Sequence, residues 1–298
     1  MKLIECVPNF SEGRDRQKGQ ALVDAAAANE EVKILDFSVD GDHHRSVMTL
    51  VGPPDAVKDA CLAACLKALD LIDMCEHVGV HPRIGAVDVV PFIPLGDADM
   101  SDAIRIAHDF GHDFSKRSQV PVYFYGEAAL APWKRDLADI RRGGYEALRE
   151  RLREPMWRPD AGPNLFNPCA GATAVGARVP LIAFNINLKS DNLHLARDIA
   201  RIIRHSSGGL PHVKAIGILL KSRNLVQVSM NLTDYRVTSL RTVFDRVREE
   251  ADRRHADILE SELIGLIPEA AMAGVTADDL KLKGFSERKI LESYYDIR

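Results

Sequence analysis

The sequence predicts an α/β (α+β) protein built from two ferredoxin-like subdomains, each with the element order β-α-β-β-α-β. The chain has 298 residues, more than one hydrophobic core usually holds. Hydrophobic residues make up 46% and charged residues 28%, which is typical of a folded globular protein. The same succession of strand and helix patterns occurs in both halves. We therefore expect domains at residues 1–178 and 179–298, with a cleft between them as the natural place for a site.

The first half alternates runs rich in β-branched residues with runs of helical periodicity. Strands are expected at Leu3–Val7, Val32–Asp40 and Ser46–Val51, in RIGAVDVVPFIP (83–94) and in VPVYFYG (120–126). Helices are expected near Arg16–Ala28, from Pro53 and Pro54 onward, and near Asp102–Lys116. Two prolines can open a helix because the N–H groups of its first turn have no partner within the helix.

The second half repeats this order. Strands are expected in LIAFNINL (181–188), on both sides of the polar turn in AIGILLKSRNLVQVSMNL (215–232), and in ELIGLIP (262–268). One helix should be capped by Asp191 and run to Arg204, and another carries an apolar stripe from Leu240 to Ala251. The segment Pro155–Pro180, rich in Pro, Gly, Asn and Ala, has little periodicity and is expected to connect the halves.

Composition and charge exclude several classes of function. A net charge of −4 gives no general attraction for nucleic acid or an anionic membrane. The N-terminal MKLIECVPNF lacks the basic-then-apolar pattern of a signal peptide, and the apolar pattern Val57–Met74 is broken by charged residues, so neither export nor membrane insertion is expected. Five cysteines, an odd number, favour reduced thiols in the cytoplasm over a disulfide framework, and Cys61 and Cys65 are expected in the core.

HPRIGAVDVVPFIP, from His81 to Pro94, is the stretch most informative about chemistry. It places a titratable histidine where a loop runs into a strand, and Pro82 disfavours helical geometry for His81. Gly85 permits close approach of another backbone or a ligand. With nine other histidines in the chain, a single His is more often structural or exposed than catalytic. The local sequence shifts this balance toward a catalytic role for His81 but does not settle it.

Two other segments are chemically suggestive. GDHHRS (41–46) is either a solvated hairpin turn or a turn whose flanking Asp40 and Arg45 contact a polar substrate. It lacks the ligand spacing of a metal site, so no metal is expected. GPNLFNPCAGATAVGA (162–177) is rich in glycine, but it has neither a G-x-G-x-x-G nor a G-K-[ST] motif. It is either a flexible connection or a cover over a flat heterocycle.

Several long motifs together resemble one known family, the glutamate formimidoyltransferases (formiminotransferases) of histidine and one-carbon folate metabolism. They are ECVPNFSEG (5–13), LVGPP (50–54), HPRIGAVDVVPFIP (81–94), VPVYFYGEAA (120–129), GPNLFNPCAGATAVGAR (162–178) and LIAFNINL (181–188), with weaker matches in LVQVSMNL and ELIGLIP. They occur in the same order as in the family and span most of the first two thirds of the chain.

The resemblance implies two α/β subdomains with a tunnel between them, a homodimer, and transfer of the formimino group of N-formimino-L-glutamate to N5 of tetrahydrofolate. The co-substrate is tetrahydrofolate and the catalytic histidine falls on His81. The family's folate-binding loop falls on Gly162, Pro163, Asn164, Leu165, Phe166, Asn167, Pro168, Cys169, Ala170 and Gly171. The GDHHR turn departs from family forms with a longer loop of small residues. We expect no cyclodeaminase domain after residue 298, and we therefore expect the product to pass to a separate cyclodeaminase.

The expected chemistry needs a proton carrier more than a nucleophile or a metal. Attack of a folate amine on the amidine carbon gives a tetrahedral centre, and the glutamate nitrogen leaves only after it is protonated. A histidine suits this exchange near neutral pH. Asp40 would favour the cationic amidine, and Arg45 or Arg83 would hold a carboxylate. A related folate-dependent formyl-group enzyme and a non-catalytic folate or small-ligand sensor remain the alternatives.

Overall fold

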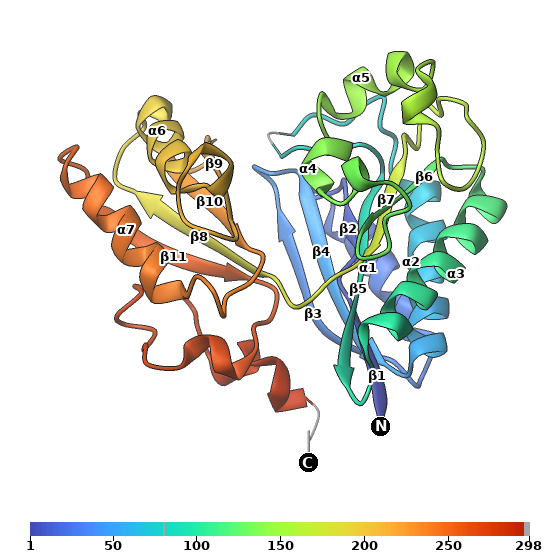
Figure 1. The fold of residues 1–298 in the computed structure, drawn as a ribbon, viewed down its shortest axis with the longest axis horizontal. Helices are drawn as coiled ribbons and strands as arrows, with labels where there is room; N and C mark the ends of the chain where they lie inside the picture. Colours follow the sequence, from blue (N-terminus) through green and yellow to red (C-terminus); the bar gives the residue numbers. More distant parts are fainter. Residues whose placement is uncertain (80, 295–298) are drawn as a thin grey trace. The chain divides into compact units, whose positions relative to one another are not determined.

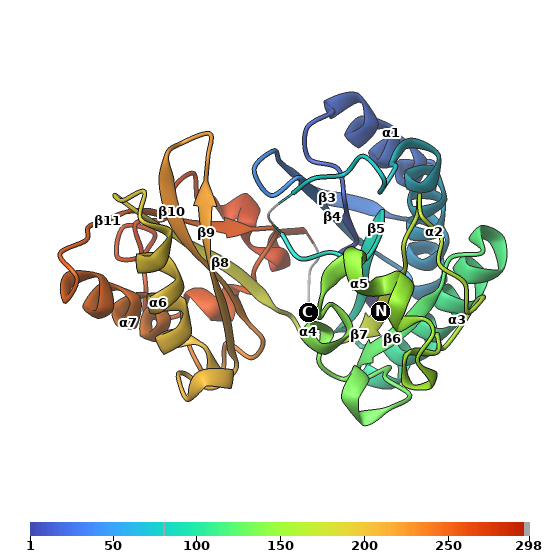
Figure 2. The same ribbon diagram turned by 90° about the horizontal axis from the view of Figure 1, so that it is seen from above.

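The computed structural model describes residues 1–79 and 81–294, and the chain divides into two compact units, Met1–Arg178 and Val179–Arg298. Each unit contains one β-sheet with helices packed against it (Figures 1 and 2). The first sheet is a 7-stranded mixed sheet and the second is a 4-stranded antiparallel one. The predicted mixed α/β class is therefore confirmed.

The sheet of the first unit is antiparallel on one side and parallel on the other. Its strands are β1 (Lys2–Cys6), β2 (Asn9–Phe10), β3 (Lys33–Asp40), β4 (Arg45–Gly52), β5 (Val87–Gly96), β6 (Val122–Gly126) and β7 (Thr173–Ala177). Strand β4 pairs antiparallel with β1, β2 and β3, and β5 pairs antiparallel with β1 and β2. Strand β7 lies between β5 and β6 and runs parallel to both.

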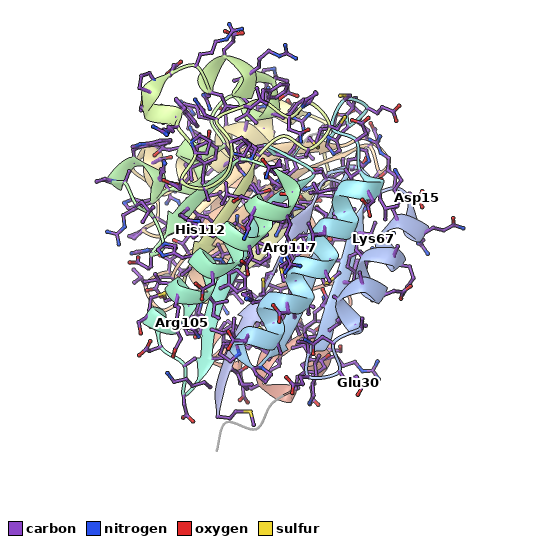
Figure 3. All side chains as sticks on the ribbon, turned by 90° about the vertical axis from the view of Figure 1, so that its right-hand side faces the viewer. Asp15, Glu30, Lys67, Arg105, His112 and Arg117 are labelled. Carbon is purple, nitrogen blue, oxygen red and sulfur yellow. The ribbon has the colours of Figure 1, made fainter. Side chains whose placement is uncertain are left out.

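Three helices, α1 (Arg16–Ala27), α2 (Pro54–Leu71) and α3 (Met100–Ser118), pack on one face of this sheet and form its main core (Figure 1). Helix α3 buries Ile106, Phe110 and Phe114 at helical spacing. Its exposed side carries polar and charged residues, among them Arg105 and Arg117 (Figure 3). Within the described residues, no helix has both the length and the apolar character needed to cross a membrane.

The cysteines of α2 belong to this core. Cys61 and Cys65 are both fully buried, and the Cys61 sulfur lies 3.6 Å from that of Cys6 and 3.8 Å from that of Cys65. As predicted, Cys61 and Cys65 fill space between α2 and the sheet, where small apolar side chains are needed for close packing.

The opposite face of the sheet is covered at its parallel end, which the sequence did not indicate. Residues 132–157, with α4 (Leu137–Ile140) and α5 (Gly144–Arg151), bring Ile140, Leu148 and Trp157 against Tyr123 of β6. The parallel end of this sheet is therefore covered on both faces. The helices are short and α5 is rich in charge, so their apolar residues make no long periodic stripe.

The expected connection Pro155–Pro180 is also only partly a connection. Its residues Thr173–Ala177 form β7, whose five residues are all buried between β5 and β6. Small residues suit this position because both faces of the strand are covered. At Gly176 an added Cβ would lie 2.5 Å from the Tyr125 ring. The sequence TAVGA has no aromatic residue, and its two β-branched residues, Thr173 and Val175, stand among alanine and glycine, which are depleted in strands.

The second unit has the order β8 (Ile182–Leu188), α6 (Leu193–Ile203), β9 (Val213–Leu220), β10 (Leu225–Leu232), α7 (Leu240–Asp252) and β11 (Ile258–Ile264). Its strands are arranged β11-β8-β10-β9, and both helices pack on one face. Helix α6 is capped by Asn192, whose side chain accepts from the His194 N–H. The expected cap, Asp191, precedes the true one by a single residue.

The other face of this second sheet carries polar side chains that bond to one another. Gln227 of β10 donates to Asn187 of β8 and to Glu262 of β11, each across 2.9 Å. Asn185 donates to Glu262 and Asn187 donates to Glu260, each across 3.1 Å. This network stabilises the observed register of the three strands, because a shift by one residue would turn these polar side chains toward the apolar core.

Candidate functional site

His81 is held by two hydrogen bonds that fix its tautomer. Its Nδ1 lies 2.8 Å from the carbonyl oxygen of Pro82, and its Nε2 lies 2.7 Å from Nη1 of Arg45. A carbonyl can only accept and a guanidinium can only donate, so Nδ1 carries the proton and Nε2 offers its lone pair. The imidazole is therefore neutral and oriented, with its basic nitrogen facing a cation.

A cluster of charges from three segments surrounds this pair. Asp88 of β5 is buried, accepts from the Ile84 N–H across 2.9 Å, and forms an ion pair with Arg141. Burial and then the positive charges of Arg45 and Arg141 hold the pKa of His81 well below its ordinary value of 6.5. A protonated ring would face the guanidinium groups of Arg45 and Arg141. At neutral pH the histidine is thus in the form of a base.

Arg45 carries the charge that most directly opposes protonation of His81. Burial, with repulsion from Arg141, lowers the pKa of Arg45 to about 10, while Asp88 and Asp40 act in the opposite direction. Arg45 therefore remains a cation at neutral pH. A guanidinium bonded to a neutral imidazole is a weaker pairing than one bonded to a carboxylate, so this group is ready to exchange its partner.

The GDHHR turn joins β3 to β4, and its two histidines point to different neighbours. Asp40 accepts from the His43 N–H across 2.8 Å, and the His43 ring stacks on His81 with centroids 5.8 Å apart. His44 instead stacks on His77 at 4.2 Å. The turn thus supports His81 from one side and does not gather its histidines at one point.

The first motif, ECVPNFSEG, braces this turn. Ser11 donates from Oγ to the carbonyl oxygen of Gly85 across 2.7 Å. Glu12 Oε1 accepts from the Arg14 N–H across 2.8 Å and lies 3.3 Å from Nε2 of His44. At Gly13 a Cβ would lie 2.1 Å from the carbonyl oxygen of Asp40, so only glycine permits this approach.

Arg83, which the sequence offers as an alternative carboxylate ligand, is engaged elsewhere. Its guanidinium forms two hydrogen bonds with Glu146, of 2.9 and 2.7 Å, and donates to His77 Nδ1 across 3.1 Å. It also lies 5.9 Å from the centre of the Tyr145 ring. The structure brings Arg45 and Asp40 together with His81, whereas Arg83 holds α5 against the loop that contains His77.

The predicted folate loop, Gly162–Gly171, is joined to the His81 segment through its C-terminal end. The Ala86 N–H donates to the carbonyl oxygen of Ala170, and the Ala172 N–H donates to that of Ile84, each across 2.9 Å. Gly171 has a φ of 70°, and a Cβ there would lie 2.2 Å from the carbonyl oxygen of Ile84. This glycine is required by the protein backbone itself.

The tip of the same loop exposes apolar surface. Leu165 is 70% exposed, and Phe166 is half-buried between Tyr145, at 5.6 Å, and the guanidinium of Arg149, at 4.9 Å. The Tyr145 hydroxyl donates to the carbonyl oxygen of Pro168. An exposed leucine beside an ordered aromatic ring forms a surface on which a flat ring system could lie.

Sequence reasoning missed Asp88 and Arg141. Asp88 has a signal in retrospect, since it is a single acidic residue within the apolar run GAVDVVPFIP and must find a partner when that run is buried. Arg141 lies 53 residues away in a short charged helical segment and has no comparable signal. Within residues 1–79 and 81–294, the three-residue grouping that could hold a metal ion is Asp73, Cys75 and Cys169, all exposed, and it includes no histidine of the turn.

The family comparisons cover nearly the whole chain. Residues 3–178 match the formiminotransferase domain, N-terminal subdomain, and residues 183–283 match the formiminotransferase domain. Glutamate formimidoyltransferase from Thermoplasma acidophilum is 46% identical over 294 residues, covering 98% of this chain and 97% of that protein. The protein of the same name from Streptococcus pyogenes serotype M1 is 40% identical, with 98% of each chain covered.

A longer relative matches over part of its length. The formimidoyltransferase-cyclodeaminase of Mus musculus is 43% identical over 282 residues, which cover 93% of this chain and 52% of that protein. The two domain matches coincide with the two units of the structure, since the first ends at residue 178 and the second lies within Val179–Arg298. On this evidence the chain belongs to the formiminotransferase family.

Proposed function

We propose that this protein transfers the formimino group of N-formimino-L-glutamate to N5 of tetrahydrofolate, giving 5-formiminotetrahydrofolate and L-glutamate. The observation that carries the proposal is the 46% identity to a glutamate formimidoyltransferase over 98% of the chain. The neutral, oriented imidazole of His81 supports it, because this transfer needs a group that accepts and returns one proton.

His81 acts as the general acid and base of the transfer. Attack by N5 on the amidine carbon places a proton on N5 that must be removed, and Nε2 of His81 has the lone pair to take it. The resulting imidazolium then protonates the glutamate nitrogen, which leaves as the amino group of glutamate. Such proton transfer typically contributes about 10²- to 10⁴-fold to a rate.

Arg45 couples donor binding to the exposure of this base. In the structure its guanidinium donates to Nε2 of His81, which blocks the lone pair. A donor carboxylate is the stronger acceptor, so its arrival would draw the guanidinium away and free Nε2. The carboxylate would also offset the charges of Arg45 and Arg141, which raises the pKa of His81 toward the range useful for proton transfer.

The tip of Gly162–Gly171 binds the folate ring system in this proposal, with Leu165 and Phe166 against its flat face. The loop is suited to that role because its end is fixed to Ile84 and Ala86 while Leu165 remains 70% exposed. The site thus combines a rigid anchor near His81 with an apolar surface, and Asp40 favours the cationic form of the amidine from the turn between β3 and β4.

Each unit supplies one ferredoxin-like half of this enzyme, with residues 1–178 and 179–298 as the two subdomains. Support comes from the antiparallel strands of the first unit, where β5, β1, β4 and β3 pair successively, and from the order β11-β8-β10-β9 in the second. Both follow the split β-α-β pattern in which the first and last strands are neighbours.

A direct assay separates the proposal from its alternatives. Purified protein is incubated with tetrahydrofolate and either N-formimino-L-glutamate or N-formyl-L-glutamate, and the folate absorbance is followed. We expect turnover with the formimino donor and a much lower rate with the formyl donor. Turnover with the formyl donor alone, or folate binding without turnover of either, would overturn the proposal.

A further inference from the structure

Two exposed cysteines from distant parts of the first unit converge, Cys169 within the loop Gly162–Gly171 and Cys75 in the segment after α2. The sulfur atoms of Cys75 and Cys169 and a carboxylate oxygen of Asp73 all lie within 4.8 Å of one another. The Met74 N–H donates to the carbonyl oxygen of Cys169 across 2.9 Å, and the Cys75 thiol donates to that of Pro168 across 3.4 Å. The two segments are therefore joined by one hydrogen bond between their backbones and one from the Cys75 thiol.

The other three cysteines provide an internal comparison. Cys6, Cys61 and Cys65 are also close to one another, but each has an exposed fraction of 0%. Solutes reach exposed thiols and not fully buried ones, so an oxidant should distinguish the two groups. The reactive pair is thus defined by exposure together with proximity, and proximity alone would not select it.

We propose that Cys75 and Cys169 form an oxidative modification site, at which a peroxide produces an intramolecular disulfide. One thiol reduces the peroxide, becomes a sulfenic acid and releases one molecule of water or alcohol. The second thiol attacks the sulfenic sulfur, the S–S bond forms, and the oxygen leaves as water with the remaining protons. Two electrons pass from the thiol pair to the peroxide. The bond requires the sulfurs, which lie within 4.8 Å of each other, to approach to about 2.05 Å.

The neighbours of the pair influence its reactivity and explain what the bond would change. The Asp73 carboxylate beside the thiol raises the pKa of Cys75, so the pair is oxidised more slowly than an ordinary dithiol at neutral pH. Closing the bond removes the thiol proton that Cys75 donates to Pro168, whose carbonyl oxygen also accepts from Tyr145. The loop would be pulled toward Cys75 at this point.

The effect on catalysis rests on the proposed function, because it assumes that Gly162–Gly171 binds folate. In that case the oxidised enzyme has a KM for tetrahydrofolate raised by about threefold or more, while the KM for the formimino donor changes less. A disulfide that closes a long chain segment should also raise the melting temperature of the protein, since it constrains the unfolded chain.

The test treats the full chain with hydrogen peroxide, removes the oxidant by desalting, and blocks remaining thiols with an alkylating agent. Peptide mapping without reduction should find the Cys75–Cys169 linkage and leave Cys6, Cys61 and Cys65 unlinked. Cys75→Ser is the matched control, because serine retains a donor for Pro168 but cannot form the bond. It should keep the reduced enzyme's activity and show neither the change in KM nor the rise in melting temperature.

The outcomes separate the modification from the proposed function. Absence of the linked peptide, or linkage through a buried cysteine, overturns the assignment of the pair. A linked peptide with an unchanged KM for tetrahydrofolate overturns the claim that the bond alters folate binding. Absence of formimino transfer by the fully reduced enzyme refutes the proposed function and leaves the peptide result standing. Dithiothreitol should restore the original KM and melting temperature.

Discussion

Arg45 donates a hydrogen bond from Nη1 to Nε2 of His81 across 2.7 Å, so the cation occupies the lone pair that a general base must use. This contact is possible only while the imidazole is neutral, and the Pro82 carbonyl oxygen fixes the remaining proton on Nδ1. The protonation state of His81 and the position of the Arg45 guanidinium are therefore coupled. Any change that moves the charge of Arg45 changes both the availability and the basicity of His81.

We expect His81→Ala to keep the fold and tetrahydrofolate binding but to lose at least about a hundredfold in turnover. The substitution removes proton transfer and leaves the loop Gly162–Gly171 in place. Steady-state kinetics and a folate titration on the same preparation provide the measurement. Turnover near that of the unmodified enzyme would contradict the role given to His81.

The pH dependence of the reaction should follow the charge of Arg45. Burial and the positive charges of Arg45 and Arg141 lower the pKa of His81, so its imidazole in the free enzyme stays neutral as the pH falls to 6.5 and is protonated only at lower pH. The acidic limb of kcat/KM should therefore lie below that pH and move to higher pH in Arg45→Gln, which removes one opposing charge. An acidic limb that stays in place when Arg45 is replaced would count against this coupling.

The same substitution should weaken binding of the donor. If Arg45 exchanges His81 for a donor carboxylate, Arg45→Gln removes a charge-assisted hydrogen bond worth about 1.5 to 3 kcal/mol, or roughly 10- to 100-fold in KM. Arg83→Gln is the matched comparison, because that guanidinium already pairs with Glu146. A larger rise in donor KM for Arg83→Gln than for Arg45→Gln would reassign the carboxylate contact.

The parts of the fold that the sequence predicts are those with a long periodic pattern. Helix α3 could be located because Ile106, Phe110 and Phe114 recur at helical spacing, and its ends were missed by only two residues at each side. Strand β7 could not be located in this way. All five residues of TAVGA are buried, and the close packing on both faces of the strand requires small side chains. Its strand conformation is imposed by pairing with β5 and β6, which no local pattern records.

In the candidate site, too, the sequence could suggest residues marked by a local motif but not those paired across long sequence distances. His81 could be proposed from the sequence because Pro82 and Gly85 mark its segment and the resemblance covers it, and the loop Gly162–Gly171 could be proposed from the resemblance. The ion pair of Asp88 with Arg141 joins residues 53 apart and depends on how α4 folds over the sheet. The partners of Arg83 are equally nonlocal, so its sequence could not distinguish a substrate contact from a structural ion pair.

Replacing Asp88 should reveal how strongly this ion pair is required. Its side chain is 2% exposed, and Asp88→Asn would leave the guanidinium of Arg141 without its carboxylate. Breaking such a buried pair typically costs about 3 to 5 kcal/mol, whereas removing both charges costs less. The melting temperature should therefore fall more in Asp88→Asn than in the double variant with Arg141→Met. Equal losses in the two proteins would contradict the claim that the unpaired guanidinium of Arg141 is what lowers the stability of Asp88→Asn.

Chelation should leave the initial rate unchanged. The proposed transfer uses proton exchange at His81 and charge pairing with Arg45, and no step requires a metal ion. The assay compares enzyme dialysed against a chelator with untreated enzyme in the same buffer. A loss of activity that a divalent metal restores would require a metal-dependent step and would direct attention to Asp73, Cys75 and Cys169.

The folate loop is best tested at its exposed tip, because its last glycine has a structural role. Gly171 has a φ of 70°, and its Cβ position lies 2.2 Å from the carbonyl oxygen of Ile84. Gly171→Val should therefore lower the melting temperature whether or not the loop binds folate. A reduced folate affinity in that variant would not distinguish a lost ligand contact from a distorted backbone.

Leu165→Ala avoids this ambiguity, since Leu165 is 70% exposed and its loss should change the free energy of unfolding by less than about 0.5 kcal/mol. If the side chain lies against the pteridine, truncation removes apolar surface that binding would bury and lowers folate affinity by about tenfold. Leu130→Ala is the matched control, because Leu130 is 62% exposed and lies outside the loop. The two variants should melt alike and differ in folate affinity. If both bind folate as the unmodified protein does, the loop tip is not the folate contact, and Gly162–Gly171 serves only to join β6 to β7.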